Sequence, residues 1–205
     1  MKNLIVITSL LTAGTLAAFA TTTLDYAKAG NFHLGYWYDD NAIALRGSWL
    51  ERDSGFYTFE ASELDFSNLK SATFNIYLED FFGTFNLKFW AVERENTDLD
   101  EAIAKEIIES VNQEAGFVST SLTLAQNGSM LSIDITSVLQ KITKGNDVAI
   151  LIGMDGRVDG CFLDYDKGAT TLSVEFFAVP EPSMFGLVAG TLALALAGTR
   201  RRRRK

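Results

Sequence analysis

Apolar and polar residues alternate along two stretches in the middle of the chain. In residues 72–78 every second side chain is apolar, and residues 85–92 begin with the same alternation. A repeat of two residues is typical of β-strands that bury one face. Residues 80–84, which lie between them, contain aspartate, glycine and threonine, so we predict a turn there and a hairpin formed by the two strands.

Six other segments also predict strands, because they are short, rich in β-branched or aromatic residues and separated by turn-forming residues. These segments are residues 56–60, 117–124, 130–135, 148–154, 161–165 and 171–177. Several short strands at such spacing favour two stacked antiparallel sheets. We therefore predict a mainly β chain in which residues 21–178 form one antiparallel β-sandwich domain.

A helical repeat interrupts the β pattern at residues 98–112. The apolar residues that recur there every four positions are Ile103, Ile107 and Val111. This spacing predicts an amphipathic helix inserted between strands, for which Thr97 and Asp98 offer capping oxygens. A shorter helical turn is predicted over residues 136–144, before Gly145.

The first twenty residues have the three parts of a secretory signal peptide. Lys2 supplies the positive charge, residues 4–16 are apolar, and residues 18–20 fit the small-x-small pattern of a cleavage site. We predict a signal helix within residues 1–20 that is removed by cleavage after Ala20. The alternative is an uncleaved membrane anchor, although the apolar stretch is short for a membrane span.

The last 27 residues, 179–205, contain three different parts in order. A tetrapeptide with two prolines precedes an apolar run over residues 184–198, and a cluster of cations follows. As a helix the apolar run would be about 23 Å long, against roughly 30 Å for the hydrocarbon core of a bilayer. The tetrapeptide and the arginine cluster consist of Val179, Pro180, Glu181, Pro182, Arg200, Arg201, Arg202, Arg203 and Arg204, and Lys205 ends the chain.

This tail closely resembles the PEP-CTERM sorting signal, in which a Pro-Glu-Pro motif precedes a membrane helix and a basic cluster. The resemblance implies transient insertion of the C-terminal helix into the inner membrane, with the cations on the cytoplasmic side. It also implies that an exosortase-type membrane protease removes the tail and that the protein reaches the cell surface or extracellular matrix. The alternative is a plain single-pass C-terminal anchor.

The net charge of the central domain limits the classes of ligand that it can bind. The whole chain carries 26 acidic and 18 basic residues. Residues 21–180 retain 25 of the acidic and 11 of the basic residues, because seven cations lie in the two tails, which gives this region a net charge of −14. A domain this acidic repels nucleic acid and anionic lipid. Clustered carboxylates also suit Ca²⁺, and Ca²⁺ is the one cofactor that the sequence indicates.

Strand-like segments follow one another in a particular order through the central domain. The segments are residues 55–60, 64–65, 69–78, 131–140, 148–152, 164–165 and 171–176. In this order they resemble the disaggregatase-related, or DNRLRE-type, jelly-roll domain of secreted bacterial proteins, a group similar in form to carbohydrate-binding modules. The resemblance implies a jelly-roll-like sandwich associated with extracellular polysaccharide. The predicted helix over residues 98–112 departs from the family pattern, so no ligand specificity is carried over.

No catalytic motif of a known type is present in the sequence. The chain has one histidine, His33, and one cysteine, Cys161, and it lacks a nucleophile elbow, a phosphate-binding loop, a zinc-protease motif and a dinucleotide fingerprint. We therefore expect no enzymatic activity. The alternative is a hydrolase with two carboxyl groups across a sugar, but no spacing singles out such a pair.

Aromatic residues and acidic turns provide the candidate binding sites. Sugar rings stack their CH faces on aromatic side chains, and the candidate ligand-binding residues are Tyr36, Trp37, Tyr38 and Trp49. Turns rich in carboxylates offer oxygen ligands for Ca²⁺, and the candidate metal residues are Asp39, Asp40, Asn41, Asp155 and Asp159. The alternatives are core packing for the aromatic residues and ordinary solvated turns for the acidic ones.

The sequence thus predicts a secreted, surface- or matrix-targeted, non-enzymatic β-sandwich protein associated with extracellular polysaccharide. A structural or adhesive matrix protein that binds other proteins is the alternative.

We predict that the mature C-terminus lies near residues 180–182, because the sorting signal directs cleavage there. Mass spectrometry of protein recovered from the surface matrix measures this end directly. Deletion of residues 179–205 should abolish surface delivery, which cell fractionation tests. Recovery of the intact tail in the membrane fraction would contradict the sorting signal.

Overall fold

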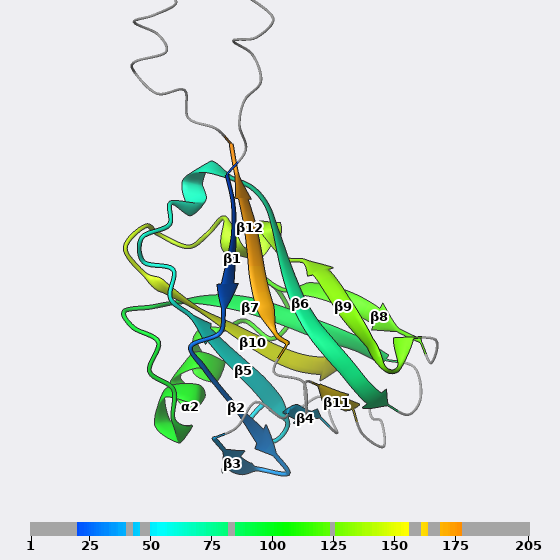
Figure 1. Cartoon of the computed structure of the whole chain (residues 1–205). Helices are drawn as coiled ribbons and strands as arrows, with labels where there is room; N and C mark the ends of the chain where they lie inside the picture. The colour runs from blue at the N-terminus through cyan, green and yellow to red at the C-terminus, as the bar shows by residue number, and fades with distance from the viewer. Residues whose placement is uncertain are drawn as a thin grey trace, which may run out of the picture. The chain divides into compact units, whose positions relative to one another are not determined.

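Two β-sheets make up most of the structure, a computed structural model that describes residues 20–39, 43–45, 50–81, 85–123, 126–155, 161–163 and 169–177 (Figure 1). The long strand β6 (Leu69–Phe81) organises the first sheet, sheet A, by pairing with β9, β11 and β12. The other strands of sheet A are β1 (Ala20–Asp25), β4 (Ile43–Leu45), β9 (Ser129–Asp134), β11 (Cys161–Leu163) and β12 (Thr171–Phe176).

Sheet B is a six-stranded sheet among the described residues, and its ladders are antiparallel. Its strands, in spatial order, are β3 (Tyr36–Tyr38), β2 (Lys28–His33), β5 (Ser54–Phe59), β10 (Asp147–Asp155), β7 (Phe85–Arg94) and β8 (Val118–Leu122). The prediction of a mainly β chain with two antiparallel sheets is therefore confirmed.

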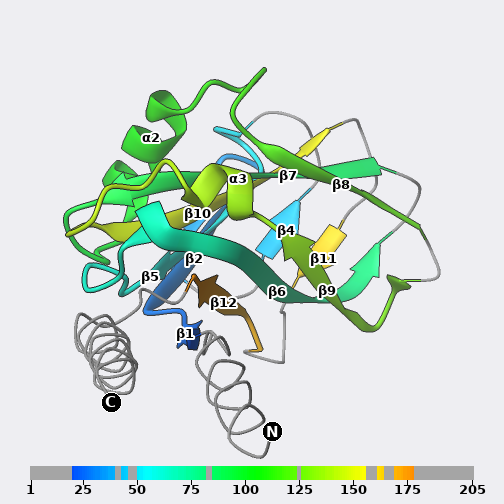
Figure 2. The same ribbon diagram turned by 90° about the horizontal axis from the view of Figure 1, so that it is seen from above.

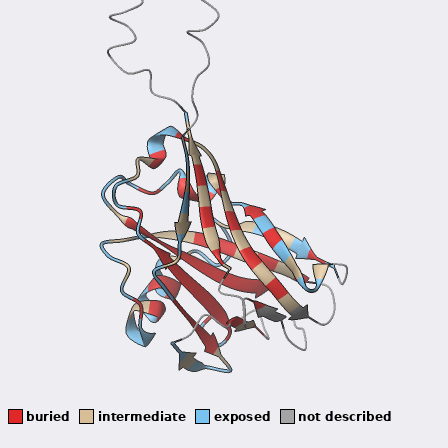
Figure 3. Cartoon of the chain, in the orientation of Figure 1, coloured by how far each residue is buried: buried red, intermediate tan, exposed pale blue. Residues whose placement is uncertain are grey.

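The apolar faces of the two sheets meet in the main hydrophobic core. Phe74 of β6 contributes from sheet A, and Tyr57 of β5 and Phe89 of β7 contribute from sheet B. The centre of the Phe74 ring lies 5.9 Å from that of Tyr57 and 5.8 Å from that of Phe89. Buried positions alternate along β6, as Figure 3 shows, so one face of sheet A is buried in this sandwich-like arrangement.

The eight predicted strand segments each overlap an observed strand, but the predicted hairpin of residues 72–78 and 85–92 is wrong. These segments belong to β6 and β7, which lie in different sheets. β7 pairs instead with β10 over nine residues and with β8 over five. The alternation shows only that each strand buries one face. Two such faces can belong to different sheets and meet across a core, as they do here. The place beside β7 is taken by β10, which is more apolar.

A second hydrophobic cluster lies on the outer face of sheet B, under helix α2 (Glu101–Ser110) (Figure 2). Ile107 and Ile108 of the helix pack there with Phe56 of β5 and Leu151 of β10. The central strands β5 and β10 are therefore buried on both faces. The predicted amphipathic helix is confirmed, although its N-cap is Asp100, whose side chain accepts a hydrogen bond from the Ile103 N–H, and not Thr97 or Asp98.

The predicted turn over residues 136–144 contains the short helix α3 (Thr136–Leu139). Asp134 accepts hydrogen bonds from the hydroxyl and the N–H of Thr136, and these bonds hold the pKa of its carboxyl below the ordinary value. Gly145 follows with a φ of 95°, a conformation that favours glycine, before β10 begins. A 3₁₀ turn, η1 (Phe66–Asn68), precedes β6.

Strand signals were missed in the N-terminal part of the domain. β1, β2 and β4 lacked a clear alternation, because β2 is buried at four consecutive positions and β4 has only three residues. The predicted signal helix within residues 1–20 and the predicted sorting signal over residues 179–205, with its membrane helix, lie outside the described residues, apart from Ala20. Among the described residues, no helix is both long and apolar enough to span a bilayer.

We predict that Asp147→Ala lowers the free energy of unfolding by about 2–4 kcal/mol, because two N–H groups would lose their acceptor. Asp147 is buried, and its Oδ1 accepts hydrogen bonds from the N–H groups of Ala61 (2.8 Å) and Ser62 (3.0 Å). Asp147→Asn keeps a side-chain oxygen and should lose less. Urea unfolding measures both variants, and wild-type stability of the Ala variant would contradict this role.

Candidate functional site

A two-residue turn joins β2 to β3 at one edge of sheet B. His33 pairs with Tyr36 across the hairpin, and Leu34 and Gly35 form the turn. Both turn residues have positive φ angles, 53° for Leu34 and 85° for Gly35. Positive φ at both positions is the hallmark of a type I′ turn, whose twist matches that of the paired strands. The hairpin therefore projects β3 from the sheet in a defined register.

The three aromatic residues of β3 have different environments. The ring centre of Trp37 lies 5.2 Å from that of Phe32 and 5.8 Å from that of Phe56, so Trp37 packs onto the cluster under α2. A Cβ atom at Gly30 would lie 2.5 Å from the Trp37 ring, so this packing requires glycine. By contrast, Tyr36 is 71% exposed and Tyr38 is 45% exposed.

The predicted aromatic group is thus divided between packing and solvent. Tyr36 and Tyr38 are two residues apart in a strand, so they project from the same face of β3. Trp37 projects from the other face and is half-buried. Trp49 lies outside the described residues. The structure therefore leaves two tyrosines as the accessible aromatic surface of this hairpin.

A buried carboxylate fixes the tip of the hairpin. Asp53 is only 2% exposed, and its Oδ1 accepts a hydrogen bond of 3.2 Å from the Leu34 N–H. The same oxygen lies 3.6 Å from Nδ1 of His33, and Oδ2 lies 3.7 Å from Nε of Arg52. The Gly35 N–H donates to the Arg52 carbonyl at 2.9 Å. Both N–H groups of the turn are therefore bound to the segment that precedes β5.

Sequence reasoning missed Asp53, Arg52 and Leu34, which share no motif and lie up to 19 positions apart. An acidic residue just before an aromatic strand would have been the available signal. His33, which we considered only for catalysis, lies with Nδ1 3.3 Å from the Ala44 carbonyl oxygen and so helps to join the hairpin to β4.

The candidate metal residues are not brought together within the described part of the chain. Asp39 is exposed after β3, and Asp155 ends β10 with its carboxylate 3.6 Å from the Lys88 ammonium. Asp40, Asn41 and Asp159 lie outside the described residues. No group of three or more potential ligands occurs among the residues that are described. Binding of Ca²⁺ therefore stays a prediction.

The sorting residues Val179, Pro180, Glu181, Pro182, Arg200, Arg201, Arg202, Arg203 and Arg204 also lie outside the described residues. Their role in processing stays a prediction.

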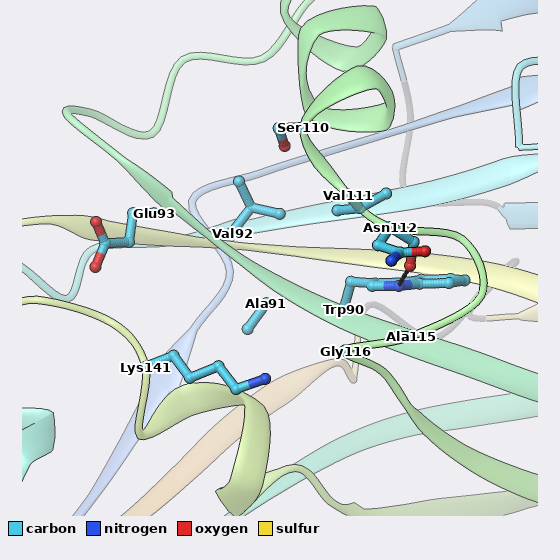
Figure 4. A pocket seen from close by; sticks show the side chains of 10 residues that line it. All are labelled: Trp90, Ala91, Val92, Glu93, Ser110, Val111, Asn112, Ala115, Gly116 and Lys141. Carbon is cyan, nitrogen blue, oxygen red and sulfur yellow. Dashed lines mark hydrogen bonds between the residues drawn. The ribbon is translucent and has the colours of Figure 1, made fainter.

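A groove of about 560 Å³ lies elsewhere, along the C-terminal half of β7 (Figure 4). Residues Trp90–Glu93 form its floor, the segment from Ser110 to Gly116 forms one wall, and Lys141 approaches from the opposite side. The Trp90 indole N–H donates to the Asn112 carbonyl at 3.1 Å, which ties the wall to the strand. None of the residues that the sequence singled out for binding lines this groove.

Among the described residues, the strand edge at the floor of the groove has no partner strand. β8 pairs with β7 only along Phe85–Phe89, whereas β10 accompanies β7 on the other side as far as Arg94. Of the residues beyond Phe89, alternate ones direct their N–H and C=O groups toward the side that β8 has left. The side-chain carboxylate of Glu93 accepts a hydrogen bond from the Thr143 N–H. The groove thus offers main-chain groups in extended spacing.

Comparison with known proteins identifies no family. No family model and no curated protein matches the chain. Among solved structures, the chain matches a family two carbohydrate esterase from Cellvibrio japonicus with a TM-score of 0.29 and 8% sequence identity. That similarity covers 80% of this chain and 36% of the esterase chain, so this chain spans about a third of it.

We predict that Asp53→Ala loosens the hairpin tip and lowers the free energy of unfolding by about 1–3 kcal/mol, because the part-buried Leu34 N–H loses its acceptor. Amide hydrogen exchange should be faster at Leu34, and urea unfolding gives the loss of stability. Asp98→Ala is the matched control, since its 3.0 Å ion pair with Lys28 is exposed and contributes little. Equal effects of the two variants would contradict an anchoring role for Asp53.

Proposed function

We propose that this chain is an exported, non-enzymatic β-sandwich protein of jelly-roll-like form that binds extracellular polysaccharide through Tyr36 and Tyr38. The observation that carries the proposal is the exposure of these two side chains, 71% and 45%, on one face of a two-stranded hairpin. Exposed aromatic rings offer flat apolar surface for the CH faces of sugar rings, and the phenol hydroxyls can bond to sugar hydroxyls.

The geometry of the hairpin suits an extended sugar chain. Residues two apart in an antiparallel strand are separated by roughly 7 Å, so the two rings present neighbouring platforms along β3. Their backbone is held by the ladder with β2 and by the hydrogen bonds of the turn to Arg52 and Asp53. A site whose backbone is already ordered loses less entropy when a ligand binds.

Export and delivery are supported by the two ends of the chain. The signal-like residues 1–20 support secretion, and the PEP-CTERM-like residues 179–205 support recognition by an exosortase-type protease and release to the cell surface or matrix. In this proposal the tail inserts into the inner membrane before cleavage. The net charge of −14 over residues 21–180 supports a ligand other than nucleic acid.

Binding to another matrix protein is the second candidate function, and the open edge of β7 favours it. The main-chain groups beyond Phe89 match those of another extended chain, and Lys141 places one cation beside the groove. The occupant would be a β-strand of a matrix protein with an acidic side chain near Lys141. A hydrolase with an acidic pair is less favoured, because no observation singles out its carboxyl groups.

We predict that Tyr36→Ala weakens polysaccharide binding roughly tenfold and that Tyr36→Ala with Tyr38→Ala removes it, because the stacking surface is lost. Affinity electrophoresis of the full-length protein through gels containing soluble polysaccharides measures the loss, with Ca²⁺ and with a chelator. Folding should be unchanged, since Tyr36 is mostly in solvent.

Met130→Ala is the matched control, because Met130 is 46% exposed but lies on β9 of sheet A. Equal binding by the wild type, the control and the tyrosine variants would contradict the tyrosine site. Capture of matrix proteins that survives both Tyr36→Ala and enzymatic removal of glycans would favour the second candidate.

A further inference from the structure

Leu34 occupies a position that neither its backbone nor its packing explains. Its φ of 53° lies in the left-handed region, and within the described part of the chain it is the one residue other than glycine with a positive φ. The first central position of a type I′ turn favours Asn, Asp or Gly. The side chains of Asn and Asp can form a local hydrogen bond in this conformation, whereas that of leucine cannot. Leucine is therefore an unfavourable residue at this position of the turn.

Within the described part of the chain, packing compensates little for this cost. Leu34 is 39% exposed, and among the described residues it belongs to neither of the two hydrophobic clusters. A backbone outlier whose cost the fold does not repay is reason to look for a function at that position.

The neighbours of Leu34 indicate what that function is. Leu34, Tyr36 and Tyr38 are three exposed large apolar residues within a segment of five, at the tip of one hairpin. Asp53 holds the Leu34 N–H, so the position of Leu34 relative to Tyr36 is fixed through the turn. An aliphatic side chain here extends the apolar surface beyond the tyrosine rings.

Charge around the hairpin limits the class of ligand. Asp39 and Glu51 are exposed on either side of it along the chain. Arg52 places a cation next to the turn, and its Nε lies 3.7 Å from the buried Asp53 carboxylate. With a net charge of −14 over residues 21–180, this surface repels polysaccharides that carry carboxylate or sulfate groups.

We propose that Leu34 is a third contact residue of the tyrosine site and that the ligand of this site is a neutral polysaccharide. This inference rests on the proposed function and deepens it. Leu34 adds apolar contact to the ligand at a cost to the stability of the free protein. A polar residue that suits the turn should therefore weaken binding and raise stability.

The test uses three variants of the full-length protein. Leu34→Asn suits the turn and removes the apolar side chain, so it should lower the unfolding equilibrium constant about fivefold and weaken binding roughly five- to tenfold. Leu34→Ala removes the side chain without suiting the turn, so it should weaken binding without a gain in stability. Leu34→Met keeps the apolar surface and should bind like the wild type.

Binding is measured by affinity electrophoresis in hydroxyethylcellulose and galactomannan, as neutral probes, and in polygalacturonate, as an anionic probe. Stability is measured by urea unfolding. Weaker binding to a neutral probe by the Asn and Ala variants but not by Met, together with higher stability of the Asn variant, supports the proposal.

The failures are distinguishable from one another. Loss of binding in Tyr36→Ala, with no loss in Leu34→Asn or Leu34→Ala, overturns the role of Leu34 and leaves the proposed function intact. No gain in stability for Leu34→Asn overturns the argument from backbone strain. Preference for polygalacturonate overturns the ligand class. Wild-type binding by Tyr36→Ala overturns the proposed function and this inference with it.

Discussion

The contact between the inner faces of the two sheets is the constraint on which the rest of the structure depends. Phe74 of sheet A lies at its centre, with the ring centres of Tyr57, Phe59 and Phe89 of sheet B all within 6.2 Å. Burial of this much apolar surface is the main driving force that holds two sheets together. In this core β6 and β7 face each other from different sheets, with the ring centres of Phe74 and Phe89 5.8 Å apart.

The outer faces of the two sheets differ, and this difference leaves the hairpin accessible. Sheet B is covered by α2 over a second cluster, and Trp37 packs at the margin of that cluster. The outer face of sheet A is polar, with Asn75 hydrogen-bonded to both Ser132 of β9 and Thr171 of β12. The edge strand β3 carries its two tyrosines on the face that is exposed to solvent, and its tryptophan packs against the cluster under α2.

Local order at the hairpin comes from a buried polar group and not from the aromatic residues. Asp53 joins the turn, His33 and Arg52 through one carboxylate, and a buried carboxylate is tolerated only with such partners. The result is a rigid tip that carries Leu34 and Tyr36. The same principle acts at Asp147, which binds the chain after β5 to the start of β10. The carboxylates of Asp53 and Asp147 thus hold two loop segments, the hairpin turn and the chain after β5, through hydrogen bonds to their N–H groups.

The sequence by itself determined eight of the strand segments and the amphipathic helix, because these follow from local periodicity of two or about four residues. The tertiary structure alone decided that β6 and β7 lie in different sheets, that β8 leaves the end of β7 open, and that Asp53 reaches Leu34. These features depend on which surfaces meet between segments distant in sequence, and periodicity within one segment carries no information about its partner.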